Sequence, residues 1–253
     1  MVNRTFSFGD CFGKGWEIFK ANVGIAILGA FVWFVIHLVG SMIPFISFVY
    51  MIVVAPPLMG GLSMFFLKLV DNNQPSVGDI FSGFQHFGEF MGVYWLFFLI
   101  GLLCAIPGGI LILIGVLLAA AVDEAVVVAP FIAIGAIIAL IATILVMLRW
   151  LFAYMIVADG WHEGSVITAF KKSAEITKGN RAQLFLAMLV LGLLAWLGIL
   201  CFGIGFFVTF PIMMCVLTVI YRELKGPAEG SSAGTEEIVL SPPTKVDEPP
   251  PSS

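Results

Sequence analysis

The chain has 253 residues, of which 60% are hydrophobic and 11% are charged, and its net charge is −4. Soluble domains are about 45–50% apolar and about 25% charged, so this composition excludes an ordinary soluble enzyme and a disordered protein. Twelve basic residues against 16 acidic ones also argue against nucleic acid as a partner. The composition therefore predicts an integral membrane protein.

Six apolar stretches are long enough to cross a bilayer, for which a helix needs about 20 residues. They cover residues 22–43, 45–70, 89–122, 125–158, 182–200 and 206–221. The expected fold is all-α, a polytopic membrane protein with six transmembrane helices in a domain over residues 1–225. Pro56 and Pro211 are expected to kink the second and sixth helices.

The basic residues predict the orientation, because Lys and Arg gather in cytoplasmic loops. With the N-terminus inside, eleven of the 12 basic residues fall on the inner side, and the outer turns hold only the acidic pair Asp123 and Glu124. Both termini are therefore expected in the cytoplasm. The exception is Arg149, which lies within the fourth apolar stretch.

Three segments of the chain resemble one another, over residues 6–71, 76–159 and 165–225. Each has an opening amphipathic segment, a span, an outer turn and a returning span. At the ends of the first two units, Asp71 matches Asp159. Because each unit has an even number of spans, the three units should be parallel pseudo-repeats with an axis along the membrane normal.

The opening segments are expected to be short helices lying at the inner interface. In the first two, Ser7 with Asp10 and Ser76 with Asp79 have the spacing of capping pairs. The basic residues of the first and third segments are candidate contacts for anionic lipid or a partner: Lys14, Lys20, Lys171, Lys172 and Lys178. The alternative is that these lysines only anchor the topology.

The second unit is longer than the first by about 19 residues, which surround its outer turn at about 110–141 and are almost all apolar. We expect a tilted hairpin kinked at Pro107 and Pro130; a re-entrant segment, extra spans or packing against another subunit are the alternatives. Gly135, Ala139 and Thr143 form a small-residue stripe that permits close helix approach.

The net charge belongs to the tail, since residues 226–253 hold five acidic residues and one lysine. This stretch is rich in proline and serine and cannot bury enough apolar surface to fold. It is predicted to be a disordered cytoplasmic tail.

Two polar residues fall within predicted spans, Arg149 and His37. An arginine deep in a helix costs about 2.5–3.5 kcal/mol on insertion scales, so it must pair, line a cavity or reach the interface. Arg149 is a candidate contact for an anion or a lipid headgroup between helices. The alternatives are a structural hydrogen bond to a neighbouring carbonyl group, or a membrane boundary that lies closer to it than assumed.

Residues 98–225 resemble a broad bacterial family of polytopic inner-membrane proteins. The similarity lies in Arg149 to Ala153, in Val157 to Gly160 and in the Lys178-Gly179-Asn180 turn. The family includes the membrane domain of glycerophosphodiester phosphodiesterases, but their catalytic domain is absent here. The resemblance implies a location in the bacterial cytoplasmic (inner) membrane, and the phosphodiesterase activity is not carried over to this chain.

No motif for nucleophilic, metal or phosphate chemistry occurs, so no cofactor, metal site or catalytic residue is expected. The four cysteines are expected to be small hydrophobic residues in the core. The preferred hypothesis is a non-enzymatic membrane module that organises lipids or partner proteins, with membrane lipids, a second copy or another membrane protein as partners. A small-molecule or lipid transporter is the alternative, and an embedded enzyme ranks third.

Overall fold

The computed structural model describes residues 5–42, 44–122, 126, 128–200 and 205–226. Over these residues the chain is helical and contains no strand, which confirms the all-α prediction. The predicted tail beyond Gly226 and the acidic outer turn at Asp123 and Glu124 lie outside the described residues.

The helices follow the same order in three successive parts of the chain: a short helix, a long apolar helix and a returning helix. The first part comprises α1 (Phe8–Ala21), α2 (Val23–Met42), α3 (Pro44–Val49), the π-helix η1 (Tyr50–Val54) and α4 (Ala55–Val70). The second comprises the 3-10 helix η2 (Val77–His86), α5 (Phe87–Val122), α6 (Val128–Arg149) and α7 (Ala153–Ala158). The third comprises α8 (Val166–Ile176), α9 (Arg181–Leu200) and α10 (Phe206–Lys225). Whether these parts are true repeats stays a prediction.

Six helical segments of the described chain are long and apolar enough to cross a membrane, as predicted. They are Val23–Met42, Ser47–Val70, Val77–Ala121, Val128–Ala158, Arg181–Leu200 and Phe206–Lys225.

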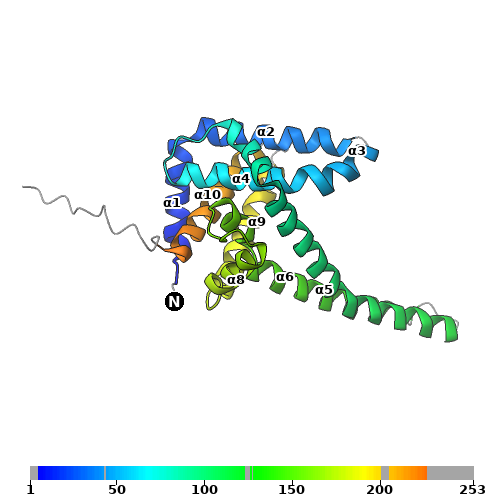
Figure 1. Ribbon diagram of the computed structural model, residues 1–253. Coiled ribbons are helices and arrows are strands. Elements are labelled where there is room, and N and C mark those ends of the chain that lie inside the picture. Colours follow the sequence, from blue (N-terminus) through cyan, green and yellow to red (C-terminus); the bar gives the residue numbers. More distant parts are fainter. Residues whose placement is uncertain (1–4, 43, 123–125, 127, 201–204, 227–253) are drawn as a thin grey trace, which may run out of the picture.

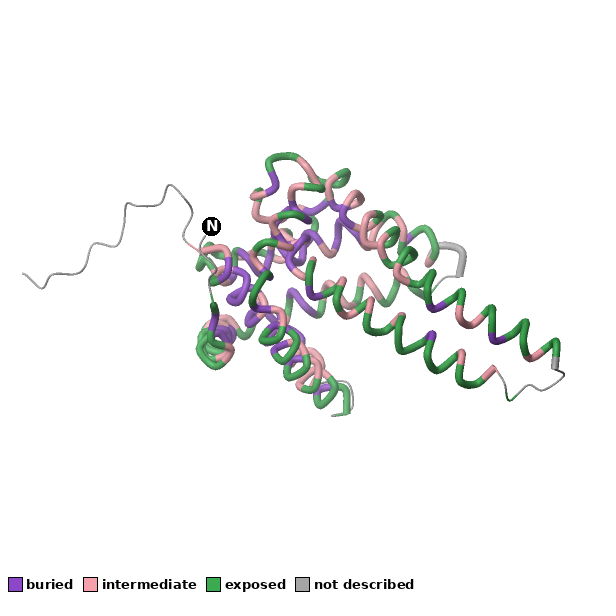
Figure 2. Tube along the Cα trace, turned by 90° about the horizontal axis from the view of Figure 1, so that it is seen from below, coloured by how far each residue is buried: buried purple, intermediate pink, exposed green. Residues whose placement is uncertain are grey.

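The long hairpins diverge from one end of the molecule, which we call the basal end and which holds α1, α8 and the C-terminal part of α10. Figure 1 shows the α2–α4 hairpin and the α5–α6 hairpin both extending from this end toward the right of the view and diverging from one another. Buried residues concentrate in α4 and α10, whereas α5 and α6 are largely exposed along their length (Figure 2). The core therefore lies near the basal end.

Backbone contact between α4 and η2 fixes this core. A Cβ atom on Gly61 would lie 1.8 Å from the carbonyl oxygen of Ile80, and one on Gly83 would lie 1.9 Å from that of Pro57. Only glycine permits such an approach. The second opening segment is thereby packed directly on the returning helix of the first hairpin.

The second span changes helix type next to Pro56, where the sequence predicts a kink. Pro56 and Pro57 lack the amide hydrogens that an α-helix would donate four residues back. The chain is a π-helix just before them, and the amide of Ala55 donates to the carbonyl of Tyr50 instead. Pro211, by contrast, lies inside α10, which continues through it as one helix.

The apolar insertion forms one long hairpin. α5 has 36 residues, or about 54 Å of helix, and changes direction partway along in Figure 1, with Pro107 inside it. The kink predicted at Pro130 is wrong, because this residue lies in the first turn of α6, where no helical hydrogen bond needs its amide. Gly108 and Gly135 bring the two arms together.

The opening segments differ in detail from their prediction. α1 packs on α10 with Cys11, Gly15 and Phe19, and leaves Trp16 exposed. Ser7 is the N-cap of α1 without a side-chain capping bond, so that predicted pair is wrong. The second pair is present, since the amide of Ser76 donates to Asp79 Oδ2 at 2.7 Å.

We expect Gly61→Ala and Gly83→Ala each to lower the free energy of unfolding by at least about 1–3 kcal/mol, because the added methyl group has no room beside a carbonyl oxygen. Gly13→Ala, in the middle of α1 with nothing within 4 Å, is the control and should not destabilise. Equilibrium unfolding in detergent micelles measures the difference. Equal stability of all three variants would contradict the backbone contact.

Candidate functional site

Two aspartates from different helices share one arginine at the basal end. Asp71 follows the last residue of α4 and Asp159 follows the last residue of α7. Arg222 Nε donates to Asp71 Oδ1 at 3.0 Å, its Nη2 donates to Asp71 Oδ2, and its Nη1 donates to Asp159 Oδ2 at 2.8 Å. A helix C-terminus carries partial negative charge, so an aspartate there is unfavourable unless a cation neutralises it. The guanidinium does this for both helices.

Asp159 receives two further donors. The hydroxyl of Tyr221 donates to its Oδ2 at 2.9 Å, and so does the Lys225 ammonium. We call these five residues the basal ion cluster: Asp71, Asp159, Tyr221, Arg222 and Lys225. Its four charged side chains are between about one-eighth and one-third exposed and Tyr221 is buried, so water screens the charges only in part.

The ring of Trp161 contacts two lysines next to this cluster. The ammonium of Lys225 is 5.2 Å from the centre of its ring and that of Lys172 is 5.0 Å away. Lys172 also donates to Glu163 Oε1 at 2.6 Å, and this bond lowers the pKa of the Glu163 carboxyl. The loop after α7 is thereby tied to α8 and to α10.

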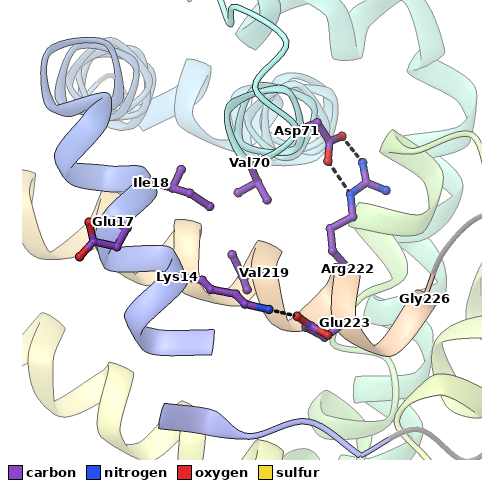
Figure 3. A pocket seen from close by; sticks show the side chains of 9 residues that line it. All are labelled: Lys14, Glu17, Ile18, Val70, Asp71, Val219, Arg222, Glu223 and Gly226. Atoms are coloured by element: carbon purple, nitrogen blue, oxygen red, sulfur yellow. Dashed lines mark hydrogen bonds and ion pairs between the residues drawn. The ribbon is translucent and has the colours of Figure 1, made fainter. Parts of the chain in front are cut away.

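An open pocket of about 640 Å³ lies beside the basal ion cluster, between α1, the end of α4 and α10 (Figure 3). Its apolar residues are Ile18, Val70 and Val219. Its polar residues are Lys14, Glu17, Asp71, Arg222 and Glu223, and Gly226 completes the lining.

The Lys14 ammonium donates to Glu223 Oε1 and so joins α1 to α10 at this pocket (Figure 3). This hydrogen bond, with the charge of the carboxylate, raises the pKa of Lys14 above its ordinary value. Both side chains remain accessible, at 60% and 44% exposure.

Arg149 is the last residue of α6, where the chain breaks before α7 begins. A helix end leaves carbonyl groups without intrahelical donors. The carbonyl oxygen of Arg149 accepts from Thr177 Oγ1 at 3.1 Å and from Ser173 Oγ at 3.3 Å. Two hydroxyl groups next to one another on α8 therefore stabilise this break.

The side chain of Arg149 is exposed, and its guanidinium carbon lies 5.5 Å from the ring centre of Trp150. No acidic side chain of the described ranges pairs with it. Trp150 in turn contacts Phe170 of α8, with ring centres 5.6 Å apart.

His37 is held by aromatic neighbours within the first hairpin. Its Nδ1 and the hydroxyl of Tyr50 are hydrogen-bonded at 2.7 Å, and its ring stacks on Trp33 at 4.6 Å. Of the two candidate polar residues in spans, only Arg149 therefore has a side chain without a polar partner in the described part of the chain.

The five candidate lysines divide into two classes. Lys14 and Lys172 pair with acids as described, and Lys20 pairs with Glu17 at 2.8 Å. Lys171 and Lys178 are exposed, and no acidic partner for them occurs among the described residues.

The structure also brings together Glu89, His86 and His162. Glu89 Oε2 lies 3.0 Å from His162 Nε2 and 3.3 Å from His86 Nδ1. Within the residues that the structure describes, no group of His, Cys, Asp and Glu is suited to hold a metal ion. Cys11, Cys104 and Cys215 are free cysteines, and burial raises the pKa of the Cys11 thiol to about 11.

Reasoning from the sequence did not single out the basal ion cluster. Its partners are 151 and 63 residues apart along the chain. The available signal was the match of Asp71 with Asp159 at the ends of two units, since equivalent acids at two helix ends require a shared or repeated cation.

A family model described as "Protein of unknown function (DUF975)" matches residues 17–228, and the chain belongs to this family. No curated protein and no solved structure matches the chain. These comparisons do not confirm the resemblance to the membrane domain of glycerophosphodiester phosphodiesterases.

We expect Asp159→Asn to lower the free energy of unfolding by on the order of 3 kcal/mol, because Arg222 and Lys225 would then lose their shared carboxylate in a largely buried place. Lys20→Gln breaks an exposed pair and should cost less than about 0.5 kcal/mol. Equilibrium unfolding in detergent compares them. A loss for Asp159→Asn no larger than for Lys20→Gln would show that the cluster does not hold the helix ends together.

Proposed function

We propose that this member of the family is a non-enzymatic membrane module that gathers anionic phospholipid headgroups at its basal end. The observation that carries this proposal is the contrast between paired and unpaired cations. Arg149, Lys171 and Lys178 are exposed without an acidic partner in the described chain, whereas Lys14, Lys20 and Lys172 are neutralised by acids of the protein.

The unpaired cations are near one another through α8. Lys171 lies in α8, and Lys178 lies in the turn directly after it. The neighbour of Lys178, Thr177, donates to the carbonyl of Arg149. This contact brings the end of α6 to the end of α8, so that the three cations belong to one region, which we call the cationic patch.

The aromatic neighbours support a position at the membrane interface. Tryptophan is enriched at the level of lipid headgroups, and arginine beside it reaches the phosphates. Trp150 lies between the guanidinium of Arg149 and the ring of Phe170 on α8. The amphipathic helix α8 packs at the depth of Trp150 and Arg149. This depth is more consistent with the headgroup region than with the bilayer centre.

We further propose that the basal end faces the cytoplasm of a bacterial cell, in its cytoplasmic membrane. The positive-inside rule supports this orientation. The lysines of α1 and α8 and the cations of the basal ion cluster all lie at this end, together with Lys68 at the end of α4.

A membrane module fits the geometry better than a transporter does. The pocket lies at the basal end and Arg149 is not among its lining residues. His37 is engaged by Tyr50 within its own hairpin. A transporter path would need polar groups that converge between the hairpins.

We expect the triple variant Arg149→Leu, Lys171→Ala, Lys178→Ala to retain much less phosphatidylglycerol than the unchanged protein. A cation near an anionic lipid contributes about 1 kcal/mol, so each substitution should weaken retention about fivefold. Native mass spectrometry of protein taken from mixed phosphatidylglycerol and phosphatidylcholine nanodiscs measures it.

The matched control is Lys20→Ala, which removes a paired cation from the same end of the molecule. It should retain phosphatidylglycerol as the unchanged protein does. Equal loss in both variants, or unchanged retention in the triple variant, would overturn the proposal.

A further inference from the structure

The net negative charge of the chain belongs to the residues that follow the described helices. Residues 1–226 hold 11 basic and 11 acidic residues, so the whole net charge of −4 lies in residues 227–253, which we call the acidic tail. Its acids are Glu229, Glu236, Glu237, Asp247 and Glu248. Such a segment is attracted to any place where the rest of the chain has cations without partners.

The cationic patch is such a place. Arg149, Lys171 and Lys178 have no acidic partner among the described residues. Arg181, the first residue of α9, adds a guanidinium whose Nε is buried without a hydrogen-bond partner in the described chain. Glu175 is the one acidic residue of α8, so positive charge is in excess around this helix.

The acidic tail begins beside α8. Gly226, the last described residue, directly follows Lys225. The ammonium groups of Lys225 and Lys172 lie 5.2 Å and 5.0 Å from the centre of the same ring, that of Trp161. Lys172 is the neighbour of Lys171 on α8. The tail therefore starts next to the helix that holds the patch, and on the same side of the membrane.

The tail is long enough to reach the whole patch. Glu236 is ten residues beyond Gly226, a length of chain that spans up to about 36 Å. α8 has 11 residues, or about 16 Å of helix. Glu236 and Glu237 can therefore meet Lys171 and Lys178 without any change in the described helices.

Attachment to the same chain compensates for the weakness of each contact. An exposed ion pair contributes little on its own. A tethered segment, however, is held near its target at an effective concentration in about the millimolar range, and several pairs act together. A lipid phosphate carries the same charge as the tail carboxylates and needs the same cations, so the two exclude one another.

We propose that the acidic tail binds the cationic patch through Glu236 and Glu237 and competes there with anionic phospholipid. This inference rests on the proposed function, since it concerns the regulation of the same lipid site. The tail is then an autoinhibitory segment, which covers the patch where anionic lipid is scarce and leaves it where such lipid is abundant.

The contact is tested by carbodiimide cross-linking, which joins a carboxylate directly to an amine, on the full chain in nanodiscs of phosphatidylcholine alone. We expect links from Glu236 or Glu237 to Lys171 or Lys178, and at least a threefold lower yield in about 1 M salt, where charges are screened beyond about 3 Å. Lys14 lines the same pocket as Gly226 but is paired with an acid, so it reports proximity alone. Links mainly to Lys14, or none to the patch, would overturn the proposal.

The competition is tested by native mass spectrometry from mixed phosphatidylglycerol and phosphatidylcholine nanodiscs. A tail-neutral variant should retain at least threefold more phosphatidylglycerol than the unchanged chain. It carries Glu229→Gln, Glu236→Gln, Glu237→Gln, Asp247→Asn and Glu248→Gln. The matched control replaces five tail serines by alanine, leaves the charge as it is and should not change retention: Ser231, Ser232, Ser241, Ser252 and Ser253. Equal retention in both variants would overturn the proposal.

The two proposals fail in different ways. If the patch does not bind anionic lipid, the triple variant of the patch retains phosphatidylglycerol unchanged, while the cross-links in phosphatidylcholine still support the tail contact. If the tail does not bind the patch, these links are absent and the triple variant still loses phosphatidylglycerol. Neutralising the tail should raise retention only where the patch is intact. An equal rise in the triple variant would show general repulsion of lipid by the tail and would overturn the inference.

Discussion

The arrangement of the helices depends on one guanidinium that neutralises two aspartates. Asp71 and Asp159 each lie at the C-terminal end of a helix, where the helix dipole makes a negative charge unfavourable. Arg222 lies in the last turn of α10, where a cation is favourable, and bonds to both. The ends of three returning helices therefore meet at one point. The pocket beside α1 exists because α4 and α10 are held together there.

The other specific contacts also join helices that apolar surface alone would not hold together. Between apolar helices in lipid there is little hydrophobic driving force, so close packing and polar contacts decide which helices associate. Gly61 and Gly83 join the first hairpin to the second opening segment, and Gly108 and Gly135 join α5 to α6. The basal end has both kinds of contact, while the far part of the α5–α6 hairpin has only its own packing. This difference accounts for hairpins that diverge from a well-packed end.

The sequence was sufficient for features that depend on length and composition. Six apolar stretches predicted six candidate spans, and Pro56-Pro57 correctly marked a change in the second one. Features that depend on tertiary contact could not be predicted in this way. Lys14 pairs with an acid 209 residues away, and Arg149 has its carbonyl bound by α8. No kink occurs at Pro130, because α6 begins at Val128 and not at Ala125, so this proline lies in the first turn and not inside the helix.

The interpretation of a basic residue depends on whether an acidic side chain pairs with it. The sequence does not show which residues are paired. The five lysines singled out from the opening segments cannot be told apart in the sequence. In the structure, three are neutralised by carboxylates, and two have no acidic partner among the described residues. A neutralised cation contributes little attraction to an anionic surface. Unpaired cations attract anionic lipid directly. The cations at one end of the protein thus fall into two classes, although the charge pattern of the sequence indicates only one.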